Sequence, residues 1–394
     1  MTAAEKKSSL SLAGIFALRM LGLFLILPVF AVYAHKLPGG ESELLIGMTL
    51  GMYGLTQAFL QIPFGAASDK FGRKPVILAG LALFAIGSIV AACAGSIWGV
   101  MLGRALQGAG AISAAVTALI ADNVRETVIT KSMALVGASI GLTFALSLVI
   151  APPLTELWGV PGLFWLTGAL AVCAMAVVRW IVPDSSHEVD RHDKAPLPWT
   201  TVAADGQLLR LNTGIFVLHA VQMALFVVVP GRLEAMGLPV LHHWYIYLPA
   251  VLIGFAVMMK PIQWAERERR LTTLLRGVTL LLTVTFGLFT FLMHSVWEIA
   301  FLVTLFFIGF NIMEASLPGL ISRVAPRSSK GLALGIYNTT QSLGLFAGGA
   351  MGGWLAQHYD AETVFVACAA LTLACFFAFA GLREPAPKAN KPIP

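Results

Sequence analysis

The dominant feature of this chain is a series of apolar stretches, each long enough to cross a lipid bilayer as one helix. One crossing needs about 20 mainly apolar residues. The sequence predicts twelve such spans, at residues 12–34, 44–67, 75–94, 98–121, 132–155, 163–182, 211–233, 243–264, 277–294, 297–320, 331–354 and 362–382. Six precede a long polar segment and six follow it. We therefore expect an all-α membrane protein of twelve transmembrane helices.

Composition agrees with a surface that faces lipid. Charged residues make up only 12% of the chain and hydrophobic residues 58%, whereas a soluble domain carries about a quarter charged residues. A surface with so few charges must face hydrocarbon over most of its area. The four cysteines lie in apolar spans without paired spacing, so neither disulfides nor zinc is indicated, and we assign no metal ligands.

The distribution of Lys and Arg predicts how the spans are oriented. Nearly all of the 26 basic residues fall in the N-terminal segment, in alternate connections or in the C-terminal segment, while Lys36 and Arg232 lie in the other connections. Cytoplasmic connections collect positive charge. We therefore expect a multi-pass protein of the bacterial inner membrane with both termini cytoplasmic. The scattered basic clusters form no single patch, so we expect no nucleic-acid partner.

The polar segment divides the chain into parts of similar length. We expect an N-terminal six-helix half at 1–182, a cytoplasmic linker at 183–210, a C-terminal six-helix half at 211–382 and a cytoplasmic tail at 383–394. The fifth span opens with KSMAL from Lys131 and the eleventh with KGLAL from Lys330, a weak internal repeat. Two halves around a midplane site are an architecture that many secondary transporters share.

Three segments resemble motifs of the major facilitator superfamily. Residues 65–74 read GAASDKFGRK, like its signature loop G-x-x-x-D-(K/R)-x-G-R-(K/R), and residues 104–110 read RALQGAG, like R-x-x-Q-G-x-G. The fifth span has Gly137 and Gly141 of the antiporter motif, but residues 151–153 read APP where Gly-Pro is expected. The resemblance implies the major facilitator fold, with two six-helix halves related by pseudo-two-fold symmetry.

Further matches at residues 18–22, 53–57, 61–65 and 311–314 resemble the YajR branch of the drug:proton antiporters. The resemblance covers nearly the whole chain and implies proton-coupled export of small molecules. YajR-type proteins often add a soluble C-terminal domain, which we expect this chain to lack because it stops at Pro394.

The signature loop is predicted to act as a conformational latch. Gly72 permits a tight turn, and Gly65 a close approach of two helices. Asp69 is placed to accept hydrogen bonds from backbone N–H groups at the start of a neighbouring helix and to pair with Arg73. By resemblance, the latch comprises Gly65, Asp69, Gly72, Arg73, Lys74 and Asp122. The alternative is a basic loop that only sets topology and contains one incidental acid.

Ionisable residues within spans are candidates for proton coupling, because charge is costly at bilayer depth. Glu314 is the first choice, since a carboxyl group in hydrocarbon is neutral until a cation or water favours its charged form. Arg19 or His219 would modulate it, and Asp69 is an alternative proton carrier. A structural acid in a permanent ion pair is the competing interpretation for Glu314, and a neutral packing donor is that for His219.

A second group of motif residues is assigned structural or coupling roles. Arg104 is expected to bind carbonyl groups freed at a kinked neighbour such as residues 152–153. The group consists of Arg104, Gln107, Gly108, Gly137, Gly141 and Pro152.

Polar and aromatic residues within the spans are predicted to line a substrate cavity. Three of them recur at every fourth position of the second span and so share one face. The predicted lining is Tyr53, Gln57, Gln61, Gln222, Asn311, Tyr337, Asn338 and Gln341.

The preferred function is export of lipophilic or cationic compounds in exchange for protons by a monomer that needs no cofactor. The sequence contains no G-x-x-x-x-G-K-[ST] phosphate loop, so the proton gradient is the expected energy source. An alternative is transport of a defined metabolite such as a sugar or organic acid, with Arg19 binding an anionic substrate. A membrane sensor or enzyme is a third hypothesis, but no H-E-x-x-H or similar cluster supports it.

Overall fold

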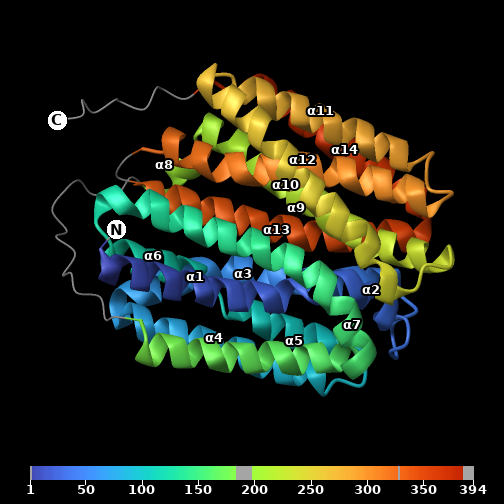
Figure 1. Ribbon diagram of the computed structural model, residues 1–394, viewed down its shortest axis with the longest axis horizontal. Helices are drawn as coiled ribbons and strands as arrows, with labels where there is room; N and C mark the ends of the chain where they lie inside the picture. Colours follow the sequence, from blue (N-terminus) through green and yellow to red (C-terminus); the bar gives the residue numbers. More distant parts are fainter. Residues whose placement is uncertain (1, 183–197, 327–328, 385–394) are drawn as a thin grey trace.

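The predicted spans form long helices that run side by side between two ends of the molecule (Figure 1). This computed structural model describes residues 2–182, 198–326 and 329–384; most of the predicted linker (183–197) and of the predicted tail (385–394) lies outside these residues. The first half contains α1 (Ala3–Phe24), α2 (Leu27–Ala34), α3 (Glu43–Phe71), α4 (Arg73–Ala92), α5 (Ile97–Ala109), α6 (Ser113–Asn123) and α7 (Glu126–Trp180). The second contains α8 (Trp199–Ala203), α9 (Gly206–Ala235), the 3₁₀ turn η1 (Val240–His242), α10 (Trp244–Arg267), α11 (Leu271–Phe289), α12 (Val296–Val324), α13 (Lys330–His358) and α14 (Ala361–Ala380).

Twelve spans result from these helices. Nine helical segments in the described part of the chain are long and apolar enough to cross a membrane. One of them, α7, contains two spans, because Gly159 (φ +66°) interrupts it just before Pro161. The broken pair α5–α6 and the long, glycine-rich α13 complete the set. The all-α membrane fold expected from the apolar stretches is therefore confirmed.

Two predicted spans differ from the expected single helix. The span at 12–34 is broken after Phe24, where Pro28 stands at the first turn of α2, a position that proline tolerates because no N–H is needed there. The span at 98–121 is broken at Gly110 between α5 and α6. A Cβ on Gly110 would overlap the carbonyl oxygen of Gly80 in α4, so the break lies where two backbones touch.

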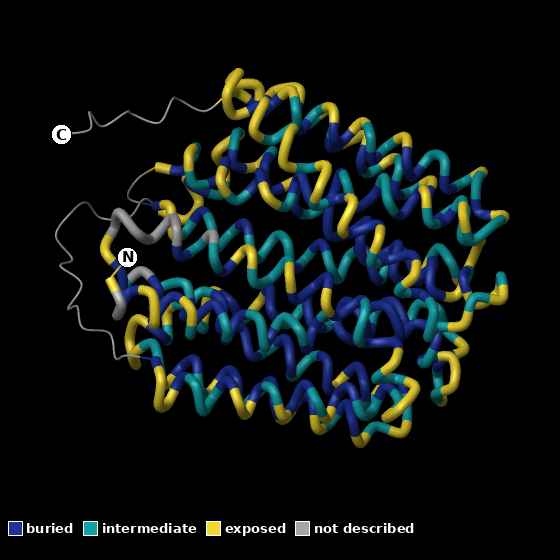
Figure 2. Tube along the Cα trace, in the orientation of Figure 1, coloured by how far each residue is buried: buried dark blue, intermediate teal, exposed yellow. Residues whose placement is uncertain are grey.

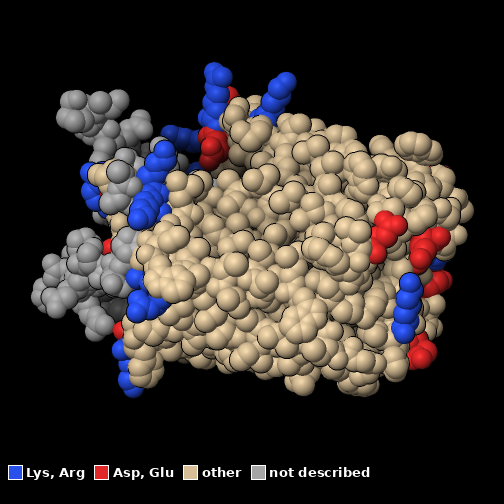
Figure 3. All heavy atoms as spheres, turned by 60° about the horizontal axis from the view of Figure 1, so that its bottom comes forward, with Lys and Arg blue, Asp and Glu red and all other residues tan. Residues whose placement is uncertain are grey.

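Charge separates the two ends of the molecule from its middle. Lys and Arg gather at the end where α1 begins and α14 ends, hereafter the basic end, and the middle of the face shown in Figure 3 carries no charged side chain. The few charged groups at the other end, hereafter the opposite end, include Glu43, Arg232, Glu298 and Glu362. Figure 2 shows buried residues along the interior of the bundle and exposed ones along its outer helices. This pattern is typical of a bundle whose apolar sides face lipid.

The two halves touch most closely near the opposite end, along α3 and α13. A Cβ on Gly47 or Gly54 would overlap the carbonyl oxygen of Gly349 or Ser342, respectively. Such backbone contact requires small residues on both helices. At the start of α3, the Gln357 side-chain oxygen accepts hydrogen bonds from Ser42 Oγ (2.7 Å) and Leu44 N (3.0 Å). We call this contact between residues 42–54 and 342–357 the α3–α13 seam.

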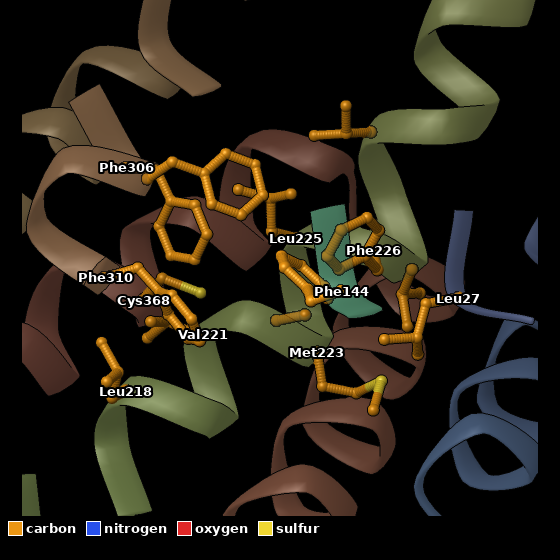
Figure 4. Packing of buried hydrophobic residues seen from close by; sticks show 14 of the residues in the cluster. Leu27, Phe144, Leu218, Val221, Met223, Leu225, Phe226, Phe306, Phe310 and Cys368 are labelled. Atoms are coloured by element: carbon orange, nitrogen blue, oxygen red, sulfur yellow. The ribbon is translucent and has the colours of Figure 1, made fainter. Parts of the chain in front are cut away.

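An aromatic cluster also joins the halves. Phe144 of α7 lies 4.9 Å, ring centroid to centroid, from Phe24 of α1. Across the interface the same ring lies 5.8 Å from Phe307 and 6.3 Å from Phe310 of α12. Figure 4 shows Phe144 among side chains of α9, with Phe306 and Phe310 of α12 nearby. We call Phe24, Phe144, Phe307 and Phe310 the aromatic bridge.

Candidate functional site

The predicted latch residues meet at the basic end around Arg73. Gly72 adopts a φ of +94°, which only glycine accepts readily, and it separates α3 from α4. Arg73 pairs with Asp69 one turn before it, and its Nε donates to Asp122 Oδ2 at 3.0 Å. Its guanidinium also donates to Ser68 Oγ at 2.8 Å. Arg73 therefore ties the ends of α3 and α6 together.

Two details of the predicted latch differ from expectation. Asp69 is 60% exposed, and in the described part of the chain no backbone N–H of another helix donates to it. A Cβ on Gly65 would meet the Ala114 side chain only at an ordinary 3.5 Å, so close helix approach does not require glycine there. Lys74 lies in the first turn of α4. The geometry thus joins Asp69, Arg73 and Asp122 within one half of the molecule.

The interior of the first half holds two buried guanidinium groups near one aromatic ring. Arg19 and Arg104 lie 5.7 and 5.1 Å from the centroid of Tyr53, which is itself buried. Cations are attracted to the face of an aromatic ring at such distances. The described residues provide neither arginine with an acidic partner within salt-bridge distance.

Arg104 is held by a network within the first half. It donates to Gln107 Oε1 (3.0 Å) and to the carbonyl oxygen of Leu50 (3.3 Å). Gln107 in turn donates to Ser88 Oγ at 2.8 Å. The expected contact with residues 152–153 of α7 is wrong, because α3 rather than the kinked α7 lies beside Arg104. The carbonyl that it binds belongs to a regular helix.

The motif glycines have different surroundings. A Cβ on Gly108 would overlap the carbonyl oxygen of Tyr53, so α3 and α5 touch there. A Cβ on Gly141 would meet the Phe255 ring of α10 at 3.2 Å, across the interface between the halves. Gly137 has nothing within 4 Å of such a Cβ, and Pro152 is buried in α7. Of Gly108, Gly137 and Gly141, Gly108 is therefore the one that direct backbone contact requires.

Arg19 has a separate set of contacts. It is 2% exposed and donates to Ser113 Oγ at 2.7 Å and to Gln57 Oε1 at 3.0 Å. Within the described residues, its Nε–H has no hydrogen-bond partner. Gln61, one turn beyond Gln57 on α3, is 1% exposed, and in the same part of the chain neither its amide nitrogen nor its oxygen has a partner.

The interior of the second half holds an acid beside a histidine. Glu314 Oε2 lies 3.8 Å from His219 Nε2, and the Glu314 side chain is 37% exposed. His219 Nδ1–H donates to the Ile215 carbonyl at 3.2 Å, while its Nε2 accepts from the Gln341 amide at 2.8 Å. These two bonds fit the neutral tautomer with its proton on Nδ1. His219, rather than Arg19, is thus the neighbour of Glu314.

The remaining predicted lining residues lie in two settings. Gln222, Asn311 and Tyr337 are buried, and Asn311 donates to the Val251 carbonyl at 3.5 Å. Asn338 and Gln341 are half-buried on α13. The Tyr337 hydroxyl has no hydrogen-bond partner. The structure therefore brings together Glu314, His219 and Gln341, and separately Arg19, Gln57 and Tyr53.

Two recesses in the described structure lie away from these groups. One of about 480 Å³ lies between α1 and α7 and includes Gly14, Leu18, Leu21 and Leu146. A second, of about 260 Å³, lies at the opposite end. None of the predicted site residues lines either recess.

Several functional positions escaped the sequence analysis. Ser113 follows the break between α5 and α6 and contacts Arg19 across 94 positions of the chain. Gln357 joins the halves at the seam, and Phe144 forms the centre of the aromatic bridge. Nothing local marks these residues.

Twelve membrane-spanning helices in two halves, with ionisable groups buried at mid-depth, define a polytopic membrane transporter rather than an enzyme. The particular family is equally plain. The chain belongs to the Major Facilitator Superfamily, whose family model matches residues 12–346 and again 263–394.

Known proteins of similar sequence and structure are transporters. The inner membrane transport protein YajR of Escherichia coli K12 is 43% identical over 387 residues, which cover 98% of this chain and 85% of YajR. The multidrug resistance protein MdtH of Proteus mirabilis is 26% identical, over 85% of this chain and 84% of MdtH. The crystal structure of a bacterial homolog of the human lysosomal transporter Spinster has a TM-score of 0.77 at 12% identity, covering 99% of this chain and all of that one.

Proposed function

We propose that this chain is a proton-coupled secondary transporter that exports small lipophilic compounds by alternating access, with Glu314 as the proton carrier. One observation supports this most directly: the Glu314 carboxyl group lies within α12 beside a neutral histidine, and 37% of its side chain is exposed. A carboxylate at bilayer depth is costly when charged. Its proton therefore exchanges when access to water changes from one side to the other.

The hydrogen bonds of His219 favour Glu314 over His219 as the proton carrier. Both ring nitrogens are already engaged, by Ile215 and by Gln341. To accept a proton at Nε2, His219 must first lose the bond from Gln341. The histidine is therefore a modulating partner in this proposal. Asp69 is exposed and paired with Arg73 at the basic end, a position that suits a latch better than proton transfer across the membrane.

Alternating access requires the halves to separate at one end while they close at the other. Here the α3–α13 seam holds them together near the opposite end, and the aromatic bridge joins them about halfway along the helices. With both termini in the cytoplasm, as the basic residues predict, this closed side faces the periplasm. The cargo then enters from the basic end, and opening of the seam releases it outward.

The proposal keeps the oligomeric state, membrane and energy source that the sequence predicts. The chain acts as a monomer in the bacterial inner membrane, takes no cofactor and draws its energy from the proton gradient. The multidrug relative MdtH supports a lipophilic cargo at 26% identity. A cationic cargo would find one acid, Glu314, but would also meet two buried arginines.

A second candidate is transport of a defined metabolite. One observation favours an organic acid over a sugar within this class: Arg19 is buried without an acidic partner in the described residues. Inward accumulation driven by protons would identify this function.

A transport screen in proteoliposomes with an imposed pH gradient tests the proposal. Compounds that the protein moves will collapse the gradient, and Glu314→Gln is expected to reduce this coupled movement at least about 100-fold, because an amide cannot carry the proton. Glu298→Gln is the matched control. Glu298 lies on the same helix, and glutamine can replace it in the capping box with Ser295. Full gradient-driven transport by Glu314→Gln would show that Glu314 is not the proton carrier.

A further inference from the structure

The two buried arginines of the first half differ in the kind of group that binds them, although among the described residues each has an unpartnered Nε–H. Arg104 is bound by a main-chain carbonyl, and its partner Gln107 is fixed in turn by Ser88. Arg19 has only two side-chain partners, Gln57 and Ser113. A guanidinium group keeps its charge in proteins and offers five N–H donors. Arg19 therefore carries an uncompensated charge with donors to spare.

A second unsatisfied group lies beside it. Gln61 follows Gln57 by one turn of α3, on the same face and nearer the basic end. Its amide is buried, with no partner for either polar atom. A buried polar group without a partner costs about 1–3 kcal/mol in folding. Arg19 binds Gln57, and Gln61 lies one turn beyond Gln57 on α3, so the two unpartnered groups together indicate a place where something other than the protein supplies the partner.

The chemistry of these groups selects an anion. Arg19 supplies a positive charge and a free Nε–H, and Gln61 supplies a free amide N–H₂. A planar carboxylate matches the fork of donors on a guanidinium group. The free oxygen of Gln61 adds one acceptor for a hydroxyl or N–H group on the same ligand.

The site also has an apolar boundary. Phe24 of the aromatic bridge follows Arg19 by five residues of α1, about 7.5 Å nearer the opposite end. On α12, Phe310 precedes Glu314 by four residues. Arg19 and Glu314 therefore both lie on the basic-end side of the aromatic bridge, one in each half. A ligand that enters from the basic end meets the polar groups first and the aromatic rings beyond them.

We propose that the cargo is an amphipathic organic anion, whose carboxylate binds Arg19 and Gln61 and whose apolar part packs against the aromatic bridge. This inference rests on the proposed export function and names its substrate class. In it, Arg19 recognises the cargo while Glu314 carries the proton. The two charges of the interior thus have separate tasks.

Binding measurements on the full chain in lipid nanodiscs, without a pH gradient, test this proposal. The probes share one apolar body and differ in charge: naphthalene-2-carboxylate, naphthalene-2-carboxamide and 2-naphthylmethylammonium. We expect the wild-type protein to bind the carboxylate at least about tenfold more tightly than the other two, the usual effect of a charge-assisted hydrogen bond. Arg19→Gln should remove the preference, and Arg19→Lys should retain part of it because the charge remains.

Gln61→Leu separates ligand binding from a structural role. Because Gln61 bonds to no protein group, its replacement should leave the unfolding temperature unchanged or raise it, yet weaken carboxylate binding about threefold or more. Asn212→Leu is the matched control, since Asn212 of α9 is a buried amide whose oxygen is also unpartnered. It should not alter carboxylate binding.

The outcomes distinguish this inference from the proposed function. A wild-type protein that does not prefer the carboxylate, or an Arg19→Gln variant that keeps the preference, overturns the anion assignment and leaves proton coupling intact. Glu314→Gln should bind the carboxylate like wild type. Its behaviour in the pH-gradient assay then decides proton coupling alone.

Discussion

The interiors of the two halves differ in charge and in how that charge is satisfied. The first half buries Arg19 and Arg104 around Tyr53, with no acid beside them in the described chain. The second half places the partly exposed Glu314 inside the bundle, with His219 as a neutral neighbour. A cation that cannot lose its proton is suited to holding a ligand, whereas a carboxyl group can exchange its proton with water. From this difference we infer that the first half binds the ligand and the second half couples transport to the proton.

The largest expected effect concerns the packing that positions the first half's arginines. Gly108→Ala would place a methyl group against the Tyr53 carbonyl, and forcing α3 and α5 apart should cost about 3 kcal/mol. Thermal unfolding in detergent measures this loss. Carboxylate binding should fall with it, because Tyr53 contacts both arginines.

Gly137→Ala is the matched control for that change. It alters another motif glycine in a helix, but a Cβ there meets nothing within 4 Å. Alanine should therefore stabilise α7 slightly, by about 0.5–1 kcal/mol from helix propensity. Equal unfolding temperatures for the two variants would contradict the role of Gly108 in helix contact.

A smaller effect is expected at the seam between the halves. Gln357→Ala removes two hydrogen bonds to the start of α3. The freed groups are exposed and regain water. We therefore expect the closed arrangement of the halves to lose about 1 kcal/mol of stability, roughly a fivefold shift toward separation at the opposite end. Distances between spin labels on α3 and α13 report this shift.

The control for Gln357 is a glutamine whose bonds stay within one half. Gln207 contacts Gly381 and Arg383, all in the second half. Gln207→Ala should leave the spin-label distances unchanged. A shift as large as that of Gln357→Ala would show that the seam bonds have no special effect on the halves.

The smallest expected effect concerns the helix caps, where the two halves also differ in charge. In the second half, hydrogen bonds from Thr363 lower the pKa of the Asp360 carboxyl below its ordinary value; in the first, the cap of α3 is Ser42, which does not titrate. A lowered carboxyl pKa adds stability above the unfolded-state pKa of about 3.9, and this is lost as pH falls through the folded-state value. Asp360→Asn should lower the unfolding temperature slightly at pH 7.

The same comparison at a pH below the folded-state pKa of Asp360 completes that test. There Asp360 is protonated in the wild type, so the difference from Asp360→Asn should disappear. Ser42→Ala, by contrast, should produce a loss that does not depend on pH in this range. A constant difference for Asp360→Asn across the acid range would contradict the assignment.

The sequence indicated the membrane fold and several contacts correctly. Apolar length alone predicts spans, because hydrocarbon leaves the backbone no partner outside the helix. The separation of Asp69 and Arg73 by one helical turn placed them together, and the signature motif pointed to Asp122 as a further partner of Arg73. The partner of Glu314 remained open between Arg19 and His219, since they lie on different helices and no local pattern orders them.

What the sequence determined by itself follows from periodicity, length and the position of charge: twelve spans, an acid and two arginines at bilayer depth, and glycines where helices cross. The tertiary structure decided which of these groups meet. The Tyr53 ring lies near both arginines, Gln341 occupies the free nitrogen of His219, and Gln61 has no partner among the described residues. The physical reason is that burial and pairing are properties of packed helices, set by contacts between residues far apart in the chain.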